Sequence, residues 1–229
     1  MKRFLLLFSC LLVAGLSCNE PQFDREIEVY FNDFDVAPYR GNNIDGVFLS
    51  QFDGSQVMGN FNNSGFDLTL ERLPAHAFIR IRFDLYIHDT WEGNSNNSET
   101  DEVDHDAWYL EFEPEELLNP ADKIIFETTF SNWICVPAWC FGQSYPNGFP
   151  HFNEARSGAL VRTAPGRCLW SGSDNGTSIY KFDKTFPHTR KNTVIAFYDR
   201  LKQSEPFSHL CEESWSLDNL RVSVITIKR

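Results

Sequence analysis

Hydrophobic and polar residues alternate most regularly between Ala77 and Trp91, in the stretch AFIRIRFDLYIHDTW. The apolar positions recur at every second residue: Ala77, Ile79, Ile81, Phe83, Leu85 and Ile87. A period of two is typical of a β-strand that buries one face in a core. A strand of this length extends about 40 Å at ~3.3 Å per residue. We therefore expect a long strand with other strands paired beside it.

Shorter segments with strand-like patterns recur along the rest of the chain, separated by turn residues such as Asp53-Gly54. They cover residues 27–31, 47–52, 57–61, 66–70, 107–112, 123–130, 158–163, 178–186, 192–200 and 217–227. Segment 192–200 is apolar on both sides, which predicts burial of both faces. Residues 114–120 contain the one helix-like turn. The pattern predicts an all-β protein: an antiparallel two-sheet β-sandwich of jelly-roll type, with almost no helix after the signal segment.

The N-terminus has the layout of a secretory signal. Lys2 and Arg3 precede an apolar run, and small residues precede Cys18. Residues 15–18 resemble a bacterial lipobox, although Gly15 replaces a larger aliphatic residue, and ordinary cleavage nearby is the competing interpretation. We expect a lipoprotein-type signal peptide over 1–17, lipidation of Cys18, a spacer over 18–26 and a single β-sandwich domain over 27–229. The protein would be exported, and either held as a lipoprotein on the outer cell surface or a periplasm-facing membrane, or secreted.

Composition narrows the range of partners. The chain of 229 residues is 42% hydrophobic, which is enough to build a core, and its net charge is −12. Nucleic acids and anionic membranes bind basic surfaces, so we exclude both as electrostatic partners. A glycan or a cell-surface protein is the expected partner, with membrane contact only through the N-terminal lipid.

Four cysteines remain after Cys10 leaves with the signal and Cys18 takes the lipid: Cys135, Cys140, Cys168 and Cys211. An even number in an exported chain predicts two disulfides. Pairing Cys135 with Cys140 would close a small loop and leave Cys168 for Cys211. A zinc site is the competing interpretation, but no Cys-x-x-Cys motif or histidine pair at ligand spacing accompanies these residues.

The C-terminal segment EESWSLDNLRV, residues 212–222, resembles the last strand of a group of uncharacterised bacterial secreted jelly-roll proteins, which ends in Glu-Ser-Trp-x-Leu-Asp-Asn-Val-x-Val. It is similar to endings in concanavalin-like and galactose-binding-like carbohydrate-binding domains and in MAM-type adhesion domains. Further landmarks of the group lie at 89–94, 106–108, 130–132, 143–146 and 187–189. The resemblance covers roughly residues 27–227 and departs at the acidic insert 95–104 and at the cysteine loop. It implies the fold, and no settled activity comes with it.

Two groups of carboxylates are candidate calcium ligands. Galactose-binding-like modules often hold a structural calcium near the chain ends, and the resemblance places Asp33, Asp35 and Asp218 there. Clustered carboxylates supply the hard oxygen ligands that calcium prefers. The acidic loop that ends at Asp106 faces Asp89 across the end of the long strand, and either solvation or calcium would offset its repulsion. We expect no other cofactor.

A catalytic interpretation rests on the segment Glu102-Val103-Asp104-His105-Asp106, which resembles the Glu-x-Asp-x-Glu strand of laminarinase-type glycoside hydrolases. Glu102 would be the nucleophile, Asp104 a helper and Asp106 the acid. The third position is Asp rather than Glu, and the neighbourhood is predicted to be a loop.

Aromatic residues beside loops are candidate sugar contacts, because sugars stack on exposed rings. Trp133, Trp139 and Tyr145 lie in irregular segments, and Trp91 follows the long strand. Together these observations predict an exported, non-catalytic cell-surface module that binds carbohydrate or acts in adhesion, with calcium as a stabilising ion. The alternative is a laminarinase-like hydrolase that uses Glu102 and Asp106. A purely structural surface protein is the third interpretation.

Overall fold

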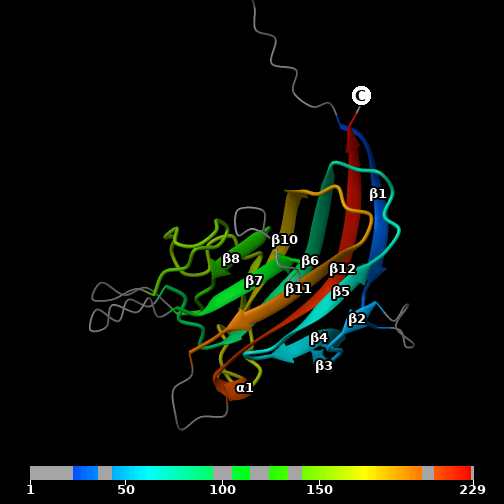
Figure 1. The fold of residues 1–229 in the computed structure, drawn as a ribbon. Helices are drawn as coiled ribbons and strands as arrows, with labels where there is room; N and C mark the ends of the chain where they lie inside the picture. The colour runs from blue at the N-terminus through cyan, green and yellow to red at the C-terminus, as the bar shows by residue number, and fades with distance from the viewer. Residues whose placement is uncertain are drawn as a thin grey trace, which may run out of the picture.

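The computed structural model describes residues 23–35, 43–94, 105–113, 124–133, 141–202 and 209–227, which form twelve strands and one short helix (Figure 1). The strands are β1 (Phe23–Asn32), β2 (Ile44–Asp45), β3 (Leu49–Phe52), β4 (Ser55–Phe61), β5 (Gly65–Leu70), β6 (Phe78–Asp89), β7 (Ala107–Phe112), β8 (Ile125–Thr129), β9 (Val161–Ala164), β10 (Thr177–Pro187), β11 (Thr193–Arg200) and β12 (Glu213–Ile227). The helix α1 (His209–Glu212) is four residues long. Among the described residues, no helix has the length and apolar character needed to cross a bilayer.

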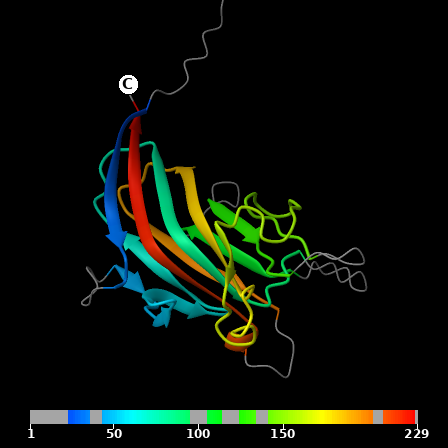
Figure 2. The same cartoon turned by 180° about the vertical axis from the view of Figure 1, so that it is seen from behind.

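The strands form two antiparallel sheets. Sheet A has the order β3-β4-β12-β6-β10-β9, with β1 also paired to β12. Sheet B has the order β2-β5-β11-β7-β8. Sheet B lies toward the viewer in Figure 1, and sheet A does so in Figure 2. Most neighbours in a sheet are distant in sequence, so the chain passes repeatedly between the two layers. The predicted all-β, two-sheet antiparallel sandwich is confirmed.

The long strand predicted from the alternation is β6, and it lies inside sheet A. It pairs with β10 from His88 opposite Thr177 to Phe78 opposite Pro187, and it pairs with β12 on its other side. Ile79, Ile81 and the other residues of its apolar side are buried. The period of two therefore identified both the element and the face that points to the core.

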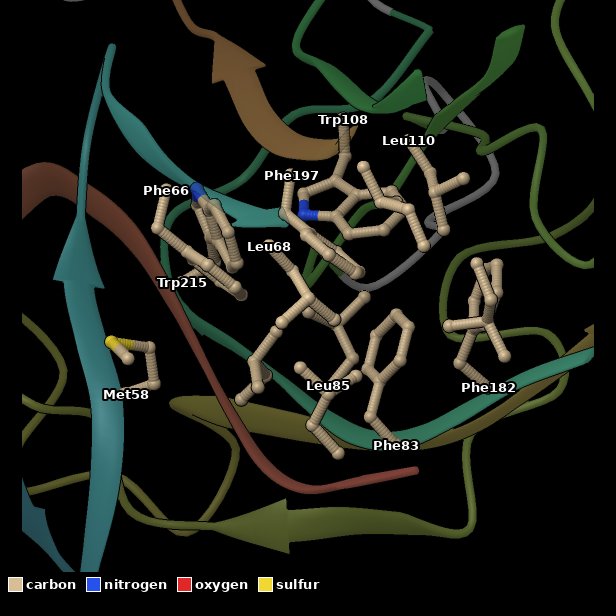
Figure 3. Packing of buried hydrophobic residues seen from close by; sticks show 14 of the residues in the cluster. Met58, Phe66, Leu68, Phe83, Leu85, Trp108, Leu110, Phe182, Phe197 and Trp215 are labelled. Carbon is tan, nitrogen blue, oxygen red and sulfur yellow. The ribbon is translucent and has the colours of Figure 1, made fainter. Parts of the chain in front are cut away.

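Large side chains from both sheets fill the space between the layers (Figure 3). Trp108 of β7 meets Trp215 of β12 edge to face, with ring centroids 5.8 Å apart. Other aromatic pairs stack within one sheet, such as Phe66 on Phe197 at 4.7 Å. Burial of each such side chain stabilises the fold by about 1.5–3 kcal/mol before entropy costs. Trp108 and Trp215 are both completely buried in this core.

A disulfide and a buried carboxylate hold the loop 165–176 against one end of sheet A. Cys168 is bonded to Cys211 across a sequence separation of 43 residues. Asp89, at the end of β6, accepts backbone hydrogen bonds from Arg167, Cys168 and Trp170. The second predicted disulfide, Cys135 with Cys140, lies outside the described residues, as do the helical turn at 114–120, the signal segment and Cys18.

One strand differs from its prediction in an informative way. Segment 192–200, now β11, lies in the middle of sheet B, but only its Ile195 and Phe197 side points into the core. On its other side Val194 and Tyr198 are only half-buried. Both sides are apolar in sequence, yet only one is covered by a second layer. The other side faces outward and forms part of the site described next.

Candidate functional site

The outer face of sheet B carries polar and aromatic side chains in two rows that cross the strands. The first, which we call the acidic row, joins Asp45, Asp67, Ala196 and Glu111 from β2, β5, β11 and β7. The second, the tyrosine row, joins Gly65, Tyr198, Tyr109 and Glu127 from β5, β11, β7 and β8. Core residues such as Leu68, Phe197 and Leu110 lie at the intervening positions, which directs both rows away from the core.

A hollow of about 520 Å³ lies over the β2, β5 and β11 side of these rows. Its lining includes Asp45, Asp67, Glu111 and Tyr198, with Ala196 and Gly65 between them. A Cβ atom at Gly65 would lie 2.0 Å from the carbonyl oxygen of Phe197, so no larger residue fits there without a backbone shift. Two small residues therefore form the floor, and acidic and tyrosine side chains form the walls. We call this feature the sheet B hollow.

The two tyrosines stand side by side and are held by carboxylates. Their rings are parallel within 8°, with centroids 4.8 Å apart. The Tyr198 hydroxyl donates to Glu111 Oε2 at 2.7 Å, and the Tyr109 hydroxyl donates to Glu127 Oε1 at 3.1 Å. Burial and the neighbouring Glu127 raise the pKa of Tyr109 to about 12, and burial likewise raises the pKa of Tyr198. Both hydroxyls stay protonated at neutral pH and act as donors.

The far end of the tyrosine row is extended by a histidine and a phenylalanine. His105 Nε2 lies 3.0 Å from Glu127 Oε1, and the His105 ring stacks on Phe149 with centroids 4.0 Å apart. The guanidinium of Arg200 lies 5.4 Å from the centre of the Tyr109 ring, within range of a cation–π contact. The rings, carboxylates and hydroxyls thus continue from the hollow to the edge strand β8.

The outer face of sheet A has a different character. Arg80 pairs with Asp183 at 2.6 Å and with Glu26 at 3.1 Å, and Arg82 also reaches Glu26 at 3.0 Å. Further along, Arg221 pairs with Glu28 at 3.0 Å. Each of these arginines is matched by a carboxylate on another strand of the sheet: Asp183 lies on the adjacent β10, and Glu26 lies on β1, beyond β12. We call this set the sheet A ion-pair ladder.

The predicted calcium residues near the chain ends come close to one another. Burial, together with the nearby charges of Asp35, Asp84 and Asp33, raises the pKa of Asp218 to about 6. Asp84 accepts from Asn219 and pairs with Lys181. No group of three or more metal-ligating side chains suited to an ion occurs in the described part of the chain. Calcium binding at these residues remains a prediction.

The other two predicted metal ligands are occupied by protein groups. The carboxylate of Asp89 accepts the three backbone hydrogen bonds that anchor the loop 165–176. Asp106 is 3% exposed, and its two oxygens accept from the backbone nitrogens of Glu92 and Lys202. Asp106 also shares a hydrogen bond with Glu213.

Glu102 and Asp104, the remaining residues of the hydrolase hypothesis, lie outside the described residues.

The predicted aromatic contacts are mostly internal. Trp91 is completely buried, and its indole nitrogen donates to the Ser214 carbonyl. Tyr145 is 5% exposed within the core. Trp133 is half-buried against Phe141 and Trp170, with its indole nitrogen bonded to the Thr90 carbonyl. Trp139 lies outside the described residues. Trp91 and Tyr145 therefore present no open ring face to solvent.

Sequence reasoning did not single out Tyr109, Glu111, Tyr198 or Asp67. A signal was present, because Tyr109 and Glu111 occupy the polar side of an alternating strand whose apolar side was recognised. That pattern shows that a residue points outward. It does not show which outward residues of separate strands are neighbours.

The sequence matches no known protein-family model and has no significant match among curated proteins.

Proposed function

We propose that this protein is an exported, non-catalytic binding module that takes a carbohydrate on the outer face of sheet B. The observation that carries the proposal is the sheet B hollow, in which a tyrosine ring and carboxylate acceptors converge over a floor of alanine and glycine. Binding sites for small ligands combine apolar ring surface with a few convergent polar groups.

The position of Gly65 gives Tyr198 its part in this proposal. One face of the Tyr198 ring stacks on Tyr109, on the neighbouring strand. The residue opposite Tyr198 on its other side is Gly65, which has no side chain to cover the second ring face. That face borders the hollow, which Tyr198 and Gly65 both line. A sugar ring has an apolar C–H face that stacks on such a surface.

The acidic row supplies the polar part of recognition. The carboxylates of Asp67 and Glu111 lie on either side of Ala196. A carboxylate accepts hydrogen bonds from hydroxyl groups, and bonds to a charged acceptor are stronger than neutral ones. Sugar hydroxyls placed over Ala196 would reach both carboxylates. Stacking and hydroxyl recognition are therefore available in one hollow.

The strand order supports the jelly-roll interpretation that accompanies this proposal. If β4, β5, β6, β7, β8, β10, β11 and β12 are numbered from one to eight, sheet A contains 1-8-3-6 and sheet B contains 2-7-4-5. This order is the one expected when a long hairpin wraps around itself as in a jelly roll. Lectin domains are among the proteins with this fold, which supports carbohydrate binding by analogy.

A titration with matched tyrosine variants tests the proposal. After a glycan array identifies a ligand, calorimetric titration compares the wild type with Tyr198→Ala and Tyr86→Ala. Tyr86 is a half-buried tyrosine on the outer face of sheet A, so it controls for loss of a similar side chain. We expect Tyr198→Ala to weaken binding at least tenfold, which corresponds to about 1.4 kcal/mol. Tyr86→Ala should bind as the wild type does.

Two outcomes would overturn the proposal. The first is an array with no bound glycan while the protein is folded by circular dichroism. The second is equal loss of affinity in both variants, which would move the binding site away from the hollow. Release of reducing sugar ends from the bound glycan would instead show catalysis and favour the hydrolase hypothesis.

A further inference from the structure

We propose that the ligand is a linear, uncharged glycan chain of about four sugar units that lies across the strands of sheet B. This inference rests on the proposed function and adds the shape, length and charge of the ligand. It comes from the arrangement of the acidic row and the tyrosine row, which continue beyond the hollow to the edge of the sheet.

The length of the ligand follows from the width of the binding face. Recognition groups occur on five adjacent strands, from Asp45 on β2 to Glu127 on β8. Neighbouring strands are ~4.8 Å apart, so these groups extend over about 19 Å. One pyranose unit of an extended chain is comparable in length to one strand spacing. A chain of about four units therefore matches the distance from one end to the other.

The direction of the chain follows from the order of the contacts. Starting in the hollow, a chain that crosses the strands meets the carboxylate of Asp67, the free ring face of Tyr198, the hydroxyl-bearing edge of Tyr109 and then Glu127. Each contact comes from a different strand. A chain that runs along β11 would leave the tyrosine row after one sugar unit. A chain that crosses the strands meets recognition groups on successive strands of the sheet.

The charge of the ligand follows from the charges around the rows. Asp45, Asp67, Glu111 and Glu127 lie along the path, and Arg200 is the cation beside the tyrosines. Like charges in a shared site repel, and the whole chain has a net charge of −12. A glycan with carboxylate or sulfate groups would be repelled along most of this path. An uncharged chain offers only hydroxyl groups to the same carboxylates.

A length series measures the first part of this inference. The probes are glucose oligomers of one to six units, linked β-1,4 or β-1,3, titrated by calorimetry. We expect affinity to rise with each unit up to about four and then to level off. Glu127→Gln should weaken binding of the four-unit oligomer by about threefold to tenfold and leave the two-unit oligomer unchanged. Glu28→Gln, on the outer face of sheet A, is the matched control and should have no effect.

A charge series measures the second part. The four-unit oligomer is compared with the same oligomer oxidised to a carboxylate at carbon 6. We expect the oxidised form to bind at least tenfold more weakly, with a smaller difference at high salt. Equal affinity for one unit and four units, or for neutral and oxidised forms, would overturn this inference while leaving carbohydrate binding in place. Failure of every glycan to bind would overturn the proposed function as well.

Discussion

The two outer faces of this sandwich present charged side chains in opposite ways. On sheet A, each arginine of the ion-pair ladder pairs with a carboxylate on another strand, as Arg80 pairs with Asp183 and Arg221 with Glu28. On sheet B, the carboxylates of Asp67 and Glu111 stand on either side of Ala196, which is too small to fill the space between them. The arginines on the outer face of sheet A are thus neutralised by carboxylates of the same face. The outer face of sheet B instead has a hollow with polar walls.

Both faces carry several charged residues, so the number of charges alone does not decide whether a face can bind a ligand. Long side chains that pair across strands cover the backbone and exclude a ligand, while small residues between polar neighbours leave room for one. Alanine and glycine on the outer side of β11 and β5 are therefore as informative as the tyrosines beside them. Three changes test how far this contrast extends, beginning with the loop that covers one end of sheet A.

The largest expected effect comes from breaking the Cys168–Cys211 disulfide. Changing both residues to alanine removes a cross-link between positions 43 residues apart. We expect a loss of about 3–4 kcal/mol of unfolding free energy, because the cross-link restricts the unfolded chain. Chemical denaturation of wild type and double variant measures the loss. Because this loop lies over sheet A, we expect glycan affinity on sheet B to stay within about twofold. A tenfold loss of affinity would show that the two faces are coupled.

A smaller effect per pH unit is expected from the buried carboxyl pair that joins the sheets, formed by Asp106, immediately before β7, and Glu213, the first residue of β12. Burial raises the pKa of Asp106 to about 6, and burial and the Asp106 charge raise the pKa of Glu213 further. Folding therefore favours the protonated pair. The unfolded state releases these protons at lower pH, so the unfolding free energy should fall as pH rises through 5 to 8. Each pH unit over which the folded protein holds one more proton than the unfolded chain lowers the unfolding free energy by about 1.4 kcal/mol.

The variant Glu213→Gln tests this pH dependence, since the amide keeps a donor for Asp106 but does not titrate. Its unfolding free energy should depend less on pH than that of the wild type. Some slope should remain, because burial also raises the pKa values of Asp89 and Asp199. Identical slopes in Glu213→Gln and wild type would contradict the assignment. Glu28→Gln is the surface control.

The smallest effect is expected from the sheet A ion-pair ladder. Arg80 is about one-third exposed, and its partners Glu26 and Asp183 are equally or more exposed. Exposed pairs of this kind contribute about 0.2–1 kcal/mol. We expect Arg80→Gln to lower the unfolding free energy by about 0.5 kcal/mol at low salt and by less at 1 M salt. A loss above 2 kcal/mol, or a change in glycan affinity, would show that the ladder has another function.

The sequence determined the element type and the core-facing side of most strands. Alternation located β6 within one or two residues and predicted the strand at 107–112, where Trp108, Leu110 and Phe112 alternate along β7 and point to the core. This succeeded because a strand has a period of two and a core excludes water, so a short stretch of sequence is enough to indicate both the strand and its buried side. The even cysteine count likewise predicted a disulfide, and the Cys168–Cys211 bond is present.

The binding face was decided by the tertiary structure. Asp67, Tyr109 and Tyr198 lie on three segments of the chain, and only the pairing of β5, β11 and β7 makes them neighbours. The same holds for Trp91 and Tyr145, which were predicted at loops but are covered by other segments. A residue's periodicity records which way it points. Which residues lie next to that side chain depends on strand register and on the packing of the other sheet, and a local sequence pattern carries no information about either.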